Sequence, residues 1–138
     1  MKTNITTFEL KTTGGTDILD ITHKVESAIE KMGGRDGLVT VFTPGSTAGV
    51  STIEYESGVI EDLKRAIEEL VPQERTYEHD KRWGDGNGYS HVRAALLKPS
   101  LTIPLKDDEM LLGTWQQIVL LDFDNRPRSR RVIVQIMG

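Results

Sequence analysis

The chain has 138 residues, 17 basic against 21 acidic side chains, a net charge of −4 and no cysteine. This length predicts one domain over residues 1–138, the missing cysteine excludes disulfide bonds, thiolate metal ligands and a cysteine nucleophile, and the acidic charge argues against nucleic acid as a partner. The N-terminus has no signal-peptide pattern and no apolar run approaches the about 20 residues of a membrane span, so we expect a cytoplasmic protein without membrane partners.

The N-terminal half predicts three strands and two helices. A Thr-rich alternating segment predicts a strand over residues 3–13. Apolar residues at helical spacing predict a helix over residues 21–32, which a pair of glycines ends. Strands are expected over residues 37–43 and 50–56, and a second helix with one clear apolar face over residues 59–71.

The C-terminal half predicts a polar loop, a short helix and three strands. The loop runs from residue 75 to Ser90, which is a good N-cap for a short helix over residues 91–97. Strands are expected over residues 100–105, 110–124 and 130–137, joined as a meander. Because strands and helices do not alternate regularly, the order predicts an α+β fold. Its sheet would be mixed and largely antiparallel, packed with two main helices and one short helix.

Two of the three histidines lie in the polar loop, and they are the candidate catalytic groups. His79 and His91 are twelve residues apart, with Asp85 midway between them. Imidazole and carboxylate groups bind divalent metals or transfer protons near neutral pH, so these residues predict a catalytic or metal-binding cluster. A solvated surface loop is the alternative, because no short metal-binding motif is present. The third histidine, His23, is predicted to be solvated on the polar face of its helix.

Two glycine-bearing segments are candidates for holding an anion. Three alternating glycines occur in the polar loop, two of them flanking Asn87, and such spacing exposes backbone N–H groups. The segment Thr43–Gly49 joins two predicted strands and offers hydroxyl groups at Ser46 and Thr47, although it lacks the phosphate-loop pattern. A phosphate cradle and a plain connecting turn are both open for this segment.

Three further groups of side chains have both a functional and a structural interpretation. Glu54 and Glu56 would share one strand face, which either lines a cleft or faces solvent. Trp115 on a predicted central strand is expected in the core, while its neighbour Gln116 needs hydrogen-bond partners in a site or an interface. Four arginines lie between residues 126 and 131, where a solvated hairpin end and phosphate recognition are both open.

The combined pattern resembles a known family. The segments YEHD, GDGNGYSHVRAALL, PSLTIPL, LLGTWQQIVLLDFD and RPRSRRVIVQI together are similar to the YjbQ-like family of small proteins, and the resemblance covers nearly the whole chain. It implies a sheet curved into a half-barrel and a homotrimer with sites near subunit interfaces. It also implies a thiamine-phosphate synthase side activity, which joins a pyrimidine methyl pyrophosphate to a thiazole phosphate and releases pyrophosphate.

The resemblance also implies which residues form the site. His79, Asp85 and His91 would be catalytic, with His79 and His91 holding a divalent metal, Mg²⁺ or Zn²⁺, and with no organic cofactor. The chain departs from the family at Tyr89, where many members have a further histidine, so a metal would rely on His79 and His91 with Asp85. The resemblance gives Ser90, Thr114, Trp115, Gln116 and Arg130 as substrate-binding residues. Ser46, Thr47, Glu54 and Asn87 join them from the residue patterns described above.

Three functions are consistent with these features. The first is a small phosphometabolite enzyme with thiamine-phosphate synthase side activity, acting on a phosphorylated small molecule. The second is a protein that binds a metal or a phosphate ligand without turnover. The third is a metal-dependent hydrolase of a small phosphorylated or cyclic substrate.

Overall fold

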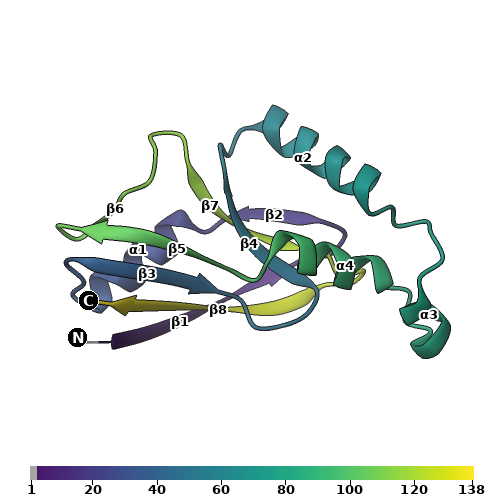
Figure 1. The fold of residues 1–138 in the computed structure, drawn as a ribbon, viewed down its shortest axis with the longest axis horizontal. Helices are drawn as coiled ribbons and strands as arrows, with labels where there is room; N and C mark the ends of the chain where they lie inside the picture. Colours follow the sequence, from purple (N-terminus) through teal and green to yellow (C-terminus); the bar gives the residue numbers. More distant parts are fainter. Residues whose placement is uncertain (1–2) are drawn as a thin grey trace.

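The computed structural model describes residues 3–138, so the first two residues of the predicted domain lie outside the described range. The described residues form eight strands and four helices (Figure 1). The strands are β1 (Thr3–Thr12), β2 (Asp17–Asp20), β3 (Gly37–Phe42), β4 (Ala48–Ile53), β5 (Ser100–Lys106), β6 (Glu109–Met110), β7 (Gln117–Asp122) and β8 (Arg128–Met137). The helices are α1 (Thr22–Lys31), α2 (Ser57–Leu70), α3 (Glu78–Trp83) and α4 (Gly88–Leu97). No helix within residues 3–138 is long and apolar enough to span a membrane.

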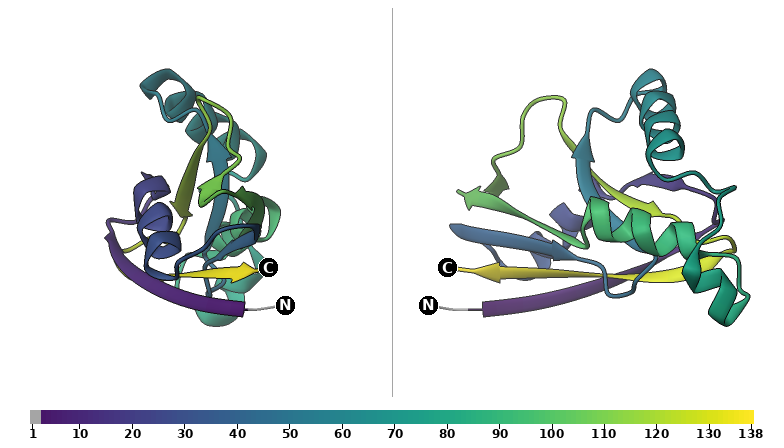
Figure 2. Two further views of the ribbon diagram at one scale, coloured as in Figure 1. Left: turned by 90° about the vertical axis from the view of Figure 1, so that its left-hand side faces the viewer. Right: turned by 45° about the vertical axis from the view of Figure 1, so that its right-hand side comes forward.

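The strands form two antiparallel sheets. Five strands pair in the order β1-β8-β3-β5-β6, and three pair in the order β2-β7-β4. Figure 2 shows the strands curving into a half-barrel, and α1 lies against β1, β7 and β8. The predicted α+β fold with a half-barrel sheet is confirmed. The predicted C-terminal meander is wrong, because β7 pairs with β2 and β4 while β5 and β8 belong to the other sheet.

Strand β7 is central because both of its faces are buried. Ile118 and Leu120 join α1 and the five-stranded sheet in one apolar cluster, whereas Val119 and Leu121 pack with α2 and α4 in a second. Such a strand reads as an unbroken apolar run, as IVLL does in this sequence. The chain leaves β7 at Asp122, which is hydrogen-bonded to side chains of both β1 and β8. The end of β7 is therefore the point where the two sheets meet.

The predicted end of the strand at residue 56 is wrong, and hydrogen bonds within the chain segment that follows Ile53 replace strand pairing there. Strand β4 ends at Ile53, so Glu54 and Glu56 do not share a strand face. Glu56 caps α2 instead, since its carboxylate accepts the N–H groups of Gly58 and Val59, each at 2.8 Å. These backbone hydrogen bonds hold the pKa of the Glu56 carboxyl below its ordinary value. Glu54 is exposed and has no such role.

Lys98 has a backbone conformation that only glycine adopts without strain. At the C-cap of α4 its φ is 74° and its ψ is 149°. Its N–H donates to the Ala94 carbonyl at 2.9 Å, and its own carbonyl accepts the N–H of Val50 at 3.0 Å, which holds the backbone there. A non-glycine residue in this region costs about 1–3 kcal/mol. The junction between α4 and β5 therefore stores strain at Lys98.

The substitution Lys98→Gly is expected to raise the free energy of unfolding by about 1 kcal/mol. The released strain exceeds the about 0.5–1 kcal/mol that glycine costs through the entropy of the unfolded chain. Urea denaturation of the two proteins measures this difference. Lys106→Gly, at an exposed position of β5, is the matched control and is expected to lower stability. A loss of stability in both variants would contradict the assignment of strain to Lys98.

Candidate functional site

His79, Asp85 and His91 lie together in the structure. Nε2 of His79 is 3.1 Å from Oδ1 of Asp85 and 3.3 Å from Oδ2. The imidazole rings of His79 and His91 have their centroids 4.4 Å apart and are tilted by 49°. His79 comes from α3, His91 from α4, and Asp85 from the loop between the two helices. The polar segment that contains both histidines is thus folded into a compact cluster.

Asp80 also belongs to the cluster, and the sequence interpretation does not include it. Atoms of His79, Asp80 and Asp85 that can bind a metal all lie within 4.8 Å of one another. Ligand atoms around one divalent cation at about 2.0–2.4 Å have this separation. Asp80 follows His79 directly in the sequence, but the side chain of Asp80 reaches the cluster only because α3 is helical. The polar composition of this segment does not predict that helix. The donor set of one imidazole and two carboxylates fits Zn²⁺, Mn²⁺ or Mg²⁺.

Helix α3 is held against α4 by short-range contacts. One carboxylate oxygen of Asp80 accepts the N–H of Gly88, the first residue of α4, at 2.9 Å. Gly88 is required here, because a Cβ atom at this position would come within 2.6 Å of the Tyr77 side chain. The loop between the helices is tied down by Asn125, whose side-chain amide donates to the Asp85 carbonyl at 2.9 Å. These contacts fix the direction from which Asp85 enters the cluster.

Ser90 does not cap α4, which corrects the sequence interpretation. The helix begins at Gly88 with Asn87 as its N-cap, so Ser90 lies inside the first turn. The Ser90 hydroxyl is fully buried and donates to the Phe123 carbonyl after β7. The Asn87 amide donates to Oδ1 of Asp124 at 3.2 Å, and Asn87 is also buried. Both residues anchor the helix that carries His91, and the Ser90 hydroxyl is directed into the protein interior.

A small pocket opens beside His91. It has a volume of about 210 Å³, and its wall includes Gly45, Ser46, His91 and Pro99. Ser46 is exposed, so its hydroxyl and the imidazole of His91 are available to the same small molecule. Its neighbour Thr47 is buried instead, and its hydroxyl donates to Asp124 at 3.2 Å and accepts from Arg130 at 2.7 Å. The predicted pair Ser46 and Thr47 is thereby divided between the pocket and the framework beneath it.

Arg130 is buried in an ion pair at the base of this region. Its Nε and Nη2 donate to the two carboxylate oxygens of Asp122 at 2.7 and 2.8 Å. Burial by itself would raise the pKa of Asp122, but the hydrogen bonds from Arg130, Thr12 and the Asp124 N–H outweigh it and hold this pKa below its ordinary value. Alternation along β8 predicts that Arg128 shares this face, and Arg128 indeed pairs with Asp124. Two of the four arginines are therefore committed to buried carboxylates.

Thr114, Trp115 and Gln116 lie outside the histidine cluster. They occupy the loop between β6 and β7, because β7 begins only at Gln117 and not at residue 110. Trp115 is 71% exposed, so its predicted place in the core is wrong. Gln116 accepts the Gly113 N–H at 3.0 Å and donates to the Thr52 hydroxyl at 3.1 Å, which supplies the partners that its amide needs. Within one chain the expected substrate-binding residues thus form two separate groups.

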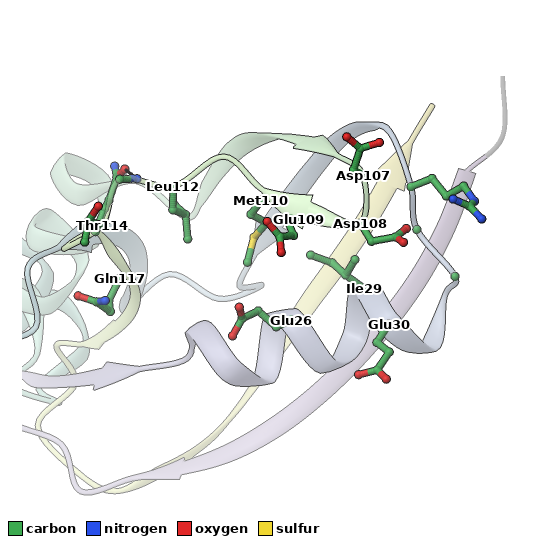
Figure 3. A pocket seen from close by; sticks show the side chains of 15 residues that line it. Glu26, Ile29, Glu30, Asp107, Asp108, Glu109, Met110, Leu112, Thr114 and Gln117 are labelled. Atoms are coloured by element: carbon green, nitrogen blue, oxygen red, sulfur yellow. Dashed lines mark hydrogen bonds between the residues drawn. The ribbon is translucent and has the colours of Figure 1, made fainter.

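A larger cavity, of about 780 Å³ against about 210 Å³, belongs to this second group and not to the histidines. It lies between α1, the β5–β6 hairpin and the loop before β7 (Figure 3). Thr114 and Gln117 line one end, and carboxylates line much of the rest together with Ile29, Met110 and Leu112. The wall residues include no histidine, so this cavity lacks the imidazole groups of the cluster. The carboxylates in the wall are Glu26, Glu30, Asp107, Asp108 and Glu109.

Tyr89 and His23 lie away from the histidine cluster. Tyr89 is 1% exposed, and the guanidinium of Arg93 stacks on its ring with 4.8 Å between the guanidinium carbon and the ring centroid. Residues two apart on a helix point about 200° apart, so Tyr89 and His91 face opposite sides of α4. The side chain of His23 is 97% exposed, and its predicted solvation is confirmed. Tyr89, where the chain departs from the family pattern, therefore lies in the packing behind α4 and outside the His91 pocket.

Comparison with the sequences of known proteins shows which family the chain matches. The family described as UPF0047 protein YjbQ-like matches residues 6–138. A UPF0047 protein of Archaeoglobus fulgidus is 43% identical over 128 residues, covering 93% of this chain and 97% of its own. The protein YugU of Bacillus subtilis, also of UPF0047, is 31% identical over 134 residues, which is 96% of this chain and 98% of its own.

Solved structures give the same answer at the level of the backbone. A hypothetical protein from Aeropyrum pernix K1 superimposes with a TM-score of 0.90 and 33% identity, covering 100% of this chain and 99% of the other. A YbjQ-like protein of unknown function from Sulfolobus solfataricus P2 gives a TM-score of 0.89 with 28% identity, covering 99% of each chain. Sequence and fold thus agree along almost the whole chain, which belongs to the UPF0047 family of YjbQ-like proteins.

Proposed function

We propose that the chain is a small phosphometabolite enzyme with thiamine-phosphate synthase activity. In this reaction the thiazole nitrogen bonds to the pyrimidine methylene carbon, the carbon–oxygen bond breaks, and its electron pair leaves with pyrophosphate. The observation that carries the proposal is the convergence of His79, Asp85 and His91 beside a pocket that also contains Ser46. Such a reaction requires a neutralised leaving group and aligned reactants more than a strong base.

His79, Asp80 and Asp85 are the residues that would hold a divalent metal. One imidazole and two carboxylates suit such an ion, and its charge would stabilise the departing pyrophosphate. His91 is left beside the pocket, where its imidazole either donates a hydrogen bond to a phosphate oxygen or gives up a proton to it. Ser46 offers a second hydrogen bond to the same oxygens. This division of roles differs from a metal held by His79 and His91.

The proposal extends to a cytoplasmic homotrimer. The pocket of about 210 Å³ in one chain is smaller than the 300–1,000 Å³ of typical ligand sites. Two substrates therefore need a further wall, which a neighbouring chain would supply. Exposed apolar side chains on α4, Val92 at 41% and Leu96 at 60%, flank this side of the molecule and favour contact with a partner.

The test is synthesis of thiamine phosphate by pure protein from the two phosphorylated substrates with Mg²⁺ or Mn²⁺. His91→Ala is expected to lower kcat/KM by at least about 100-fold, the usual loss when a proton-transferring group is removed. His23→Ala is the matched control, because that imidazole is exposed and distant, and it should retain the wild-type rate. Product formed equally by wild type and His91→Ala would overturn the proposal.

Two other results would each redirect the assignment. If the protein binds Mn²⁺ and pyrophosphate tightly but forms no product, the site is a binding site without turnover. If it releases phosphate from simple monoesters faster than it forms thiamine phosphate, a metal-dependent hydrolase is the better description. Both outcomes contradict the synthase proposal, and both still require His79 and Asp85.

A further inference from the structure

Asp124 accepts four hydrogen bonds from three separate parts of the chain. Oδ1 accepts from the Asn87 amide at 3.2 Å and from the Asn125 N–H at 2.8 Å. Oδ2 accepts from the Thr47 hydroxyl at 3.2 Å and from Nε of Arg128 at 2.8 Å. The residue itself is fully buried. Asn87 directly precedes α4, and Thr47 directly follows Ser46 of the pocket. Asn125 belongs to the turn that leads into β8, and Arg128 is the first residue of that strand.

We propose that the Asp124 carboxylate is a positioning residue for the candidate site, an inference that rests on the proposed function of that site. Its contact with Asn87 sets the start of α4, and thus the place of His91 four residues later. Its contact with Thr47 sets the backbone of Ser46, which shares the pocket with His91. One side chain therefore determines the distance between the two polar groups of the pocket.

Only an ionised carboxylate can fill this role. It has about four acceptor positions on two oxygens and no donor, whereas an amide of the same shape has one accepting oxygen and a donating nitrogen. In Asp124→Asn at least one of Asn87, Thr47 and Arg128 must lose its acceptor. Burial alone would raise the pKa of Asp124, but the hydrogen bonds from Asn87, Asn125 and Arg128 keep it below the ordinary value.

Asn125 extends the influence of the same turn to Asp85. The Asn125 N–H is held by Asp124, while its side chain donates to the Asp85 carbonyl at 2.9 Å. The turn after β7 thus contacts the loop that carries Asp85, the N-cap of α4 and the segment before β4. Neither Asp124 nor Asn125 belongs to the wall of the His91 pocket, so their effect on a ligand there is indirect.

The experiment separates positioning from simple charge balance. Asp124→Asn leaves Arg128 without its carboxylate, so this variant alone could lose activity through instability. The double variant Asp124→Asn/Arg128→Gln removes both charges and is expected to regain most of the stability that Asp124→Asn loses, as its urea midpoint measures. Positioning predicts that kcat nevertheless stays about 100-fold below wild type, the loss expected from a displacement of about 1 Å, while Arg128→Gln alone keeps most of its activity.

A readout without substrates keeps the inference independent of the synthase assignment. The chain has three histidines, so their imidazole NMR signals are resolved easily, with exposed His23 as the internal reference. In the double variant the His91 signals are expected to shift while those of His23 do not. Wild-type kcat in the double variant, or unchanged His91 signals, would overturn the positioning role. Absence of synthase activity in wild type together with a His91 shift would reject only the proposed reaction.

Discussion

Replacement of Arg130 by methionine is expected to lower the free energy of unfolding by about 3–5 kcal/mol. The change removes both hydrogen bonds to Asp122 and leaves a fully buried carboxylate without a counter-charge. Breaking one side of a buried ion pair costs this amount because the remaining charge stays desolvated. Methionine retains most of the apolar volume, so the loss reports on the charge. Urea denaturation at neutral pH gives the measurement.

Arg131→Met is the matched control for this result. Arg131 is the next residue of β8, but it is exposed and points to the opposite side of the strand. A substitution there is expected to change stability by less than about 0.5 kcal/mol. If Arg130→Met lowered the free energy of unfolding by no more than Arg131→Met does, the ion pair would make no net contribution to stability.

The sign of the pH dependence follows from the pKa of Asp122, which is lowered by folding. A lowered carboxyl pKa gives stability that is present above the unfolded value of about 3.9 and is lost as the pH falls through the folded value. Wild type should therefore lose stability in acid. The difference in the free energy of unfolding between wild type and Arg130→Met should narrow below about pH 4. A constant gap from pH 7 to pH 3 would contradict this origin.

His79→Ala and Asp80→Asn are each expected to weaken Mn²⁺ binding by at least about 100-fold. Even residues behind the ligands typically contribute 10–100-fold, so loss of a direct ligand should reach or exceed this range. Asparagine is chosen for Asp80 because its amide oxygen can still accept the Gly88 N–H. Calorimetric titration of Mn²⁺ provides the affinities.

The same titration distinguishes two possible ligand sets. If His79, Asp80 and Asp85 hold the ion, His91→Ala should weaken binding by less than about 10-fold, because His91 would be neither a ligand nor a hydrogen-bond partner of one. If His79 and His91 hold it, His91→Ala should match His79→Ala, and Asp80→Asn should have little effect. His23→Ala serves as the control and should leave the affinity unchanged.

The elements with a long, regular apolar pattern are those that the sequence predicts well. The apolar faces of α1 and α2 and the alternation of β8 follow directly from residue spacing. Strand β2 has only four residues, too few for an alternation to be seen, and α3 has no buried residue to mark a face. Pairing order is also hidden, since the partners of β7 come from the first half of the chain.

The candidate site is predictable in its residue types and not in its geometry. Chemistry and spacing indicate His79, Asp85 and His91, and these three side chains lie together in the structure. The sequence predicts a core position for Trp115 because the apolar run from residue 110 hides the late start of β7 at Gln117. The roles of Asp122 and Asp124 have a weaker signal in the sequence: two acids that end a buried strand require partners, and the arginines that follow supply them.

The pairing of β1 with β8 has a consequence for how the site forms during folding. Thr12 lies opposite Arg128, so this pair joins residues from the two ends of the described chain. Contacts across such a separation form slowly, on the order of milliseconds to seconds in small β-rich domains, because the entropy of closing the loop is lost before any contact is gained. The Thr12 hydroxyl can donate to Asp122, beneath the site, only once β1 has docked. In refolding experiments the capacity to bind a ligand should therefore appear with the slowest phase of sheet formation.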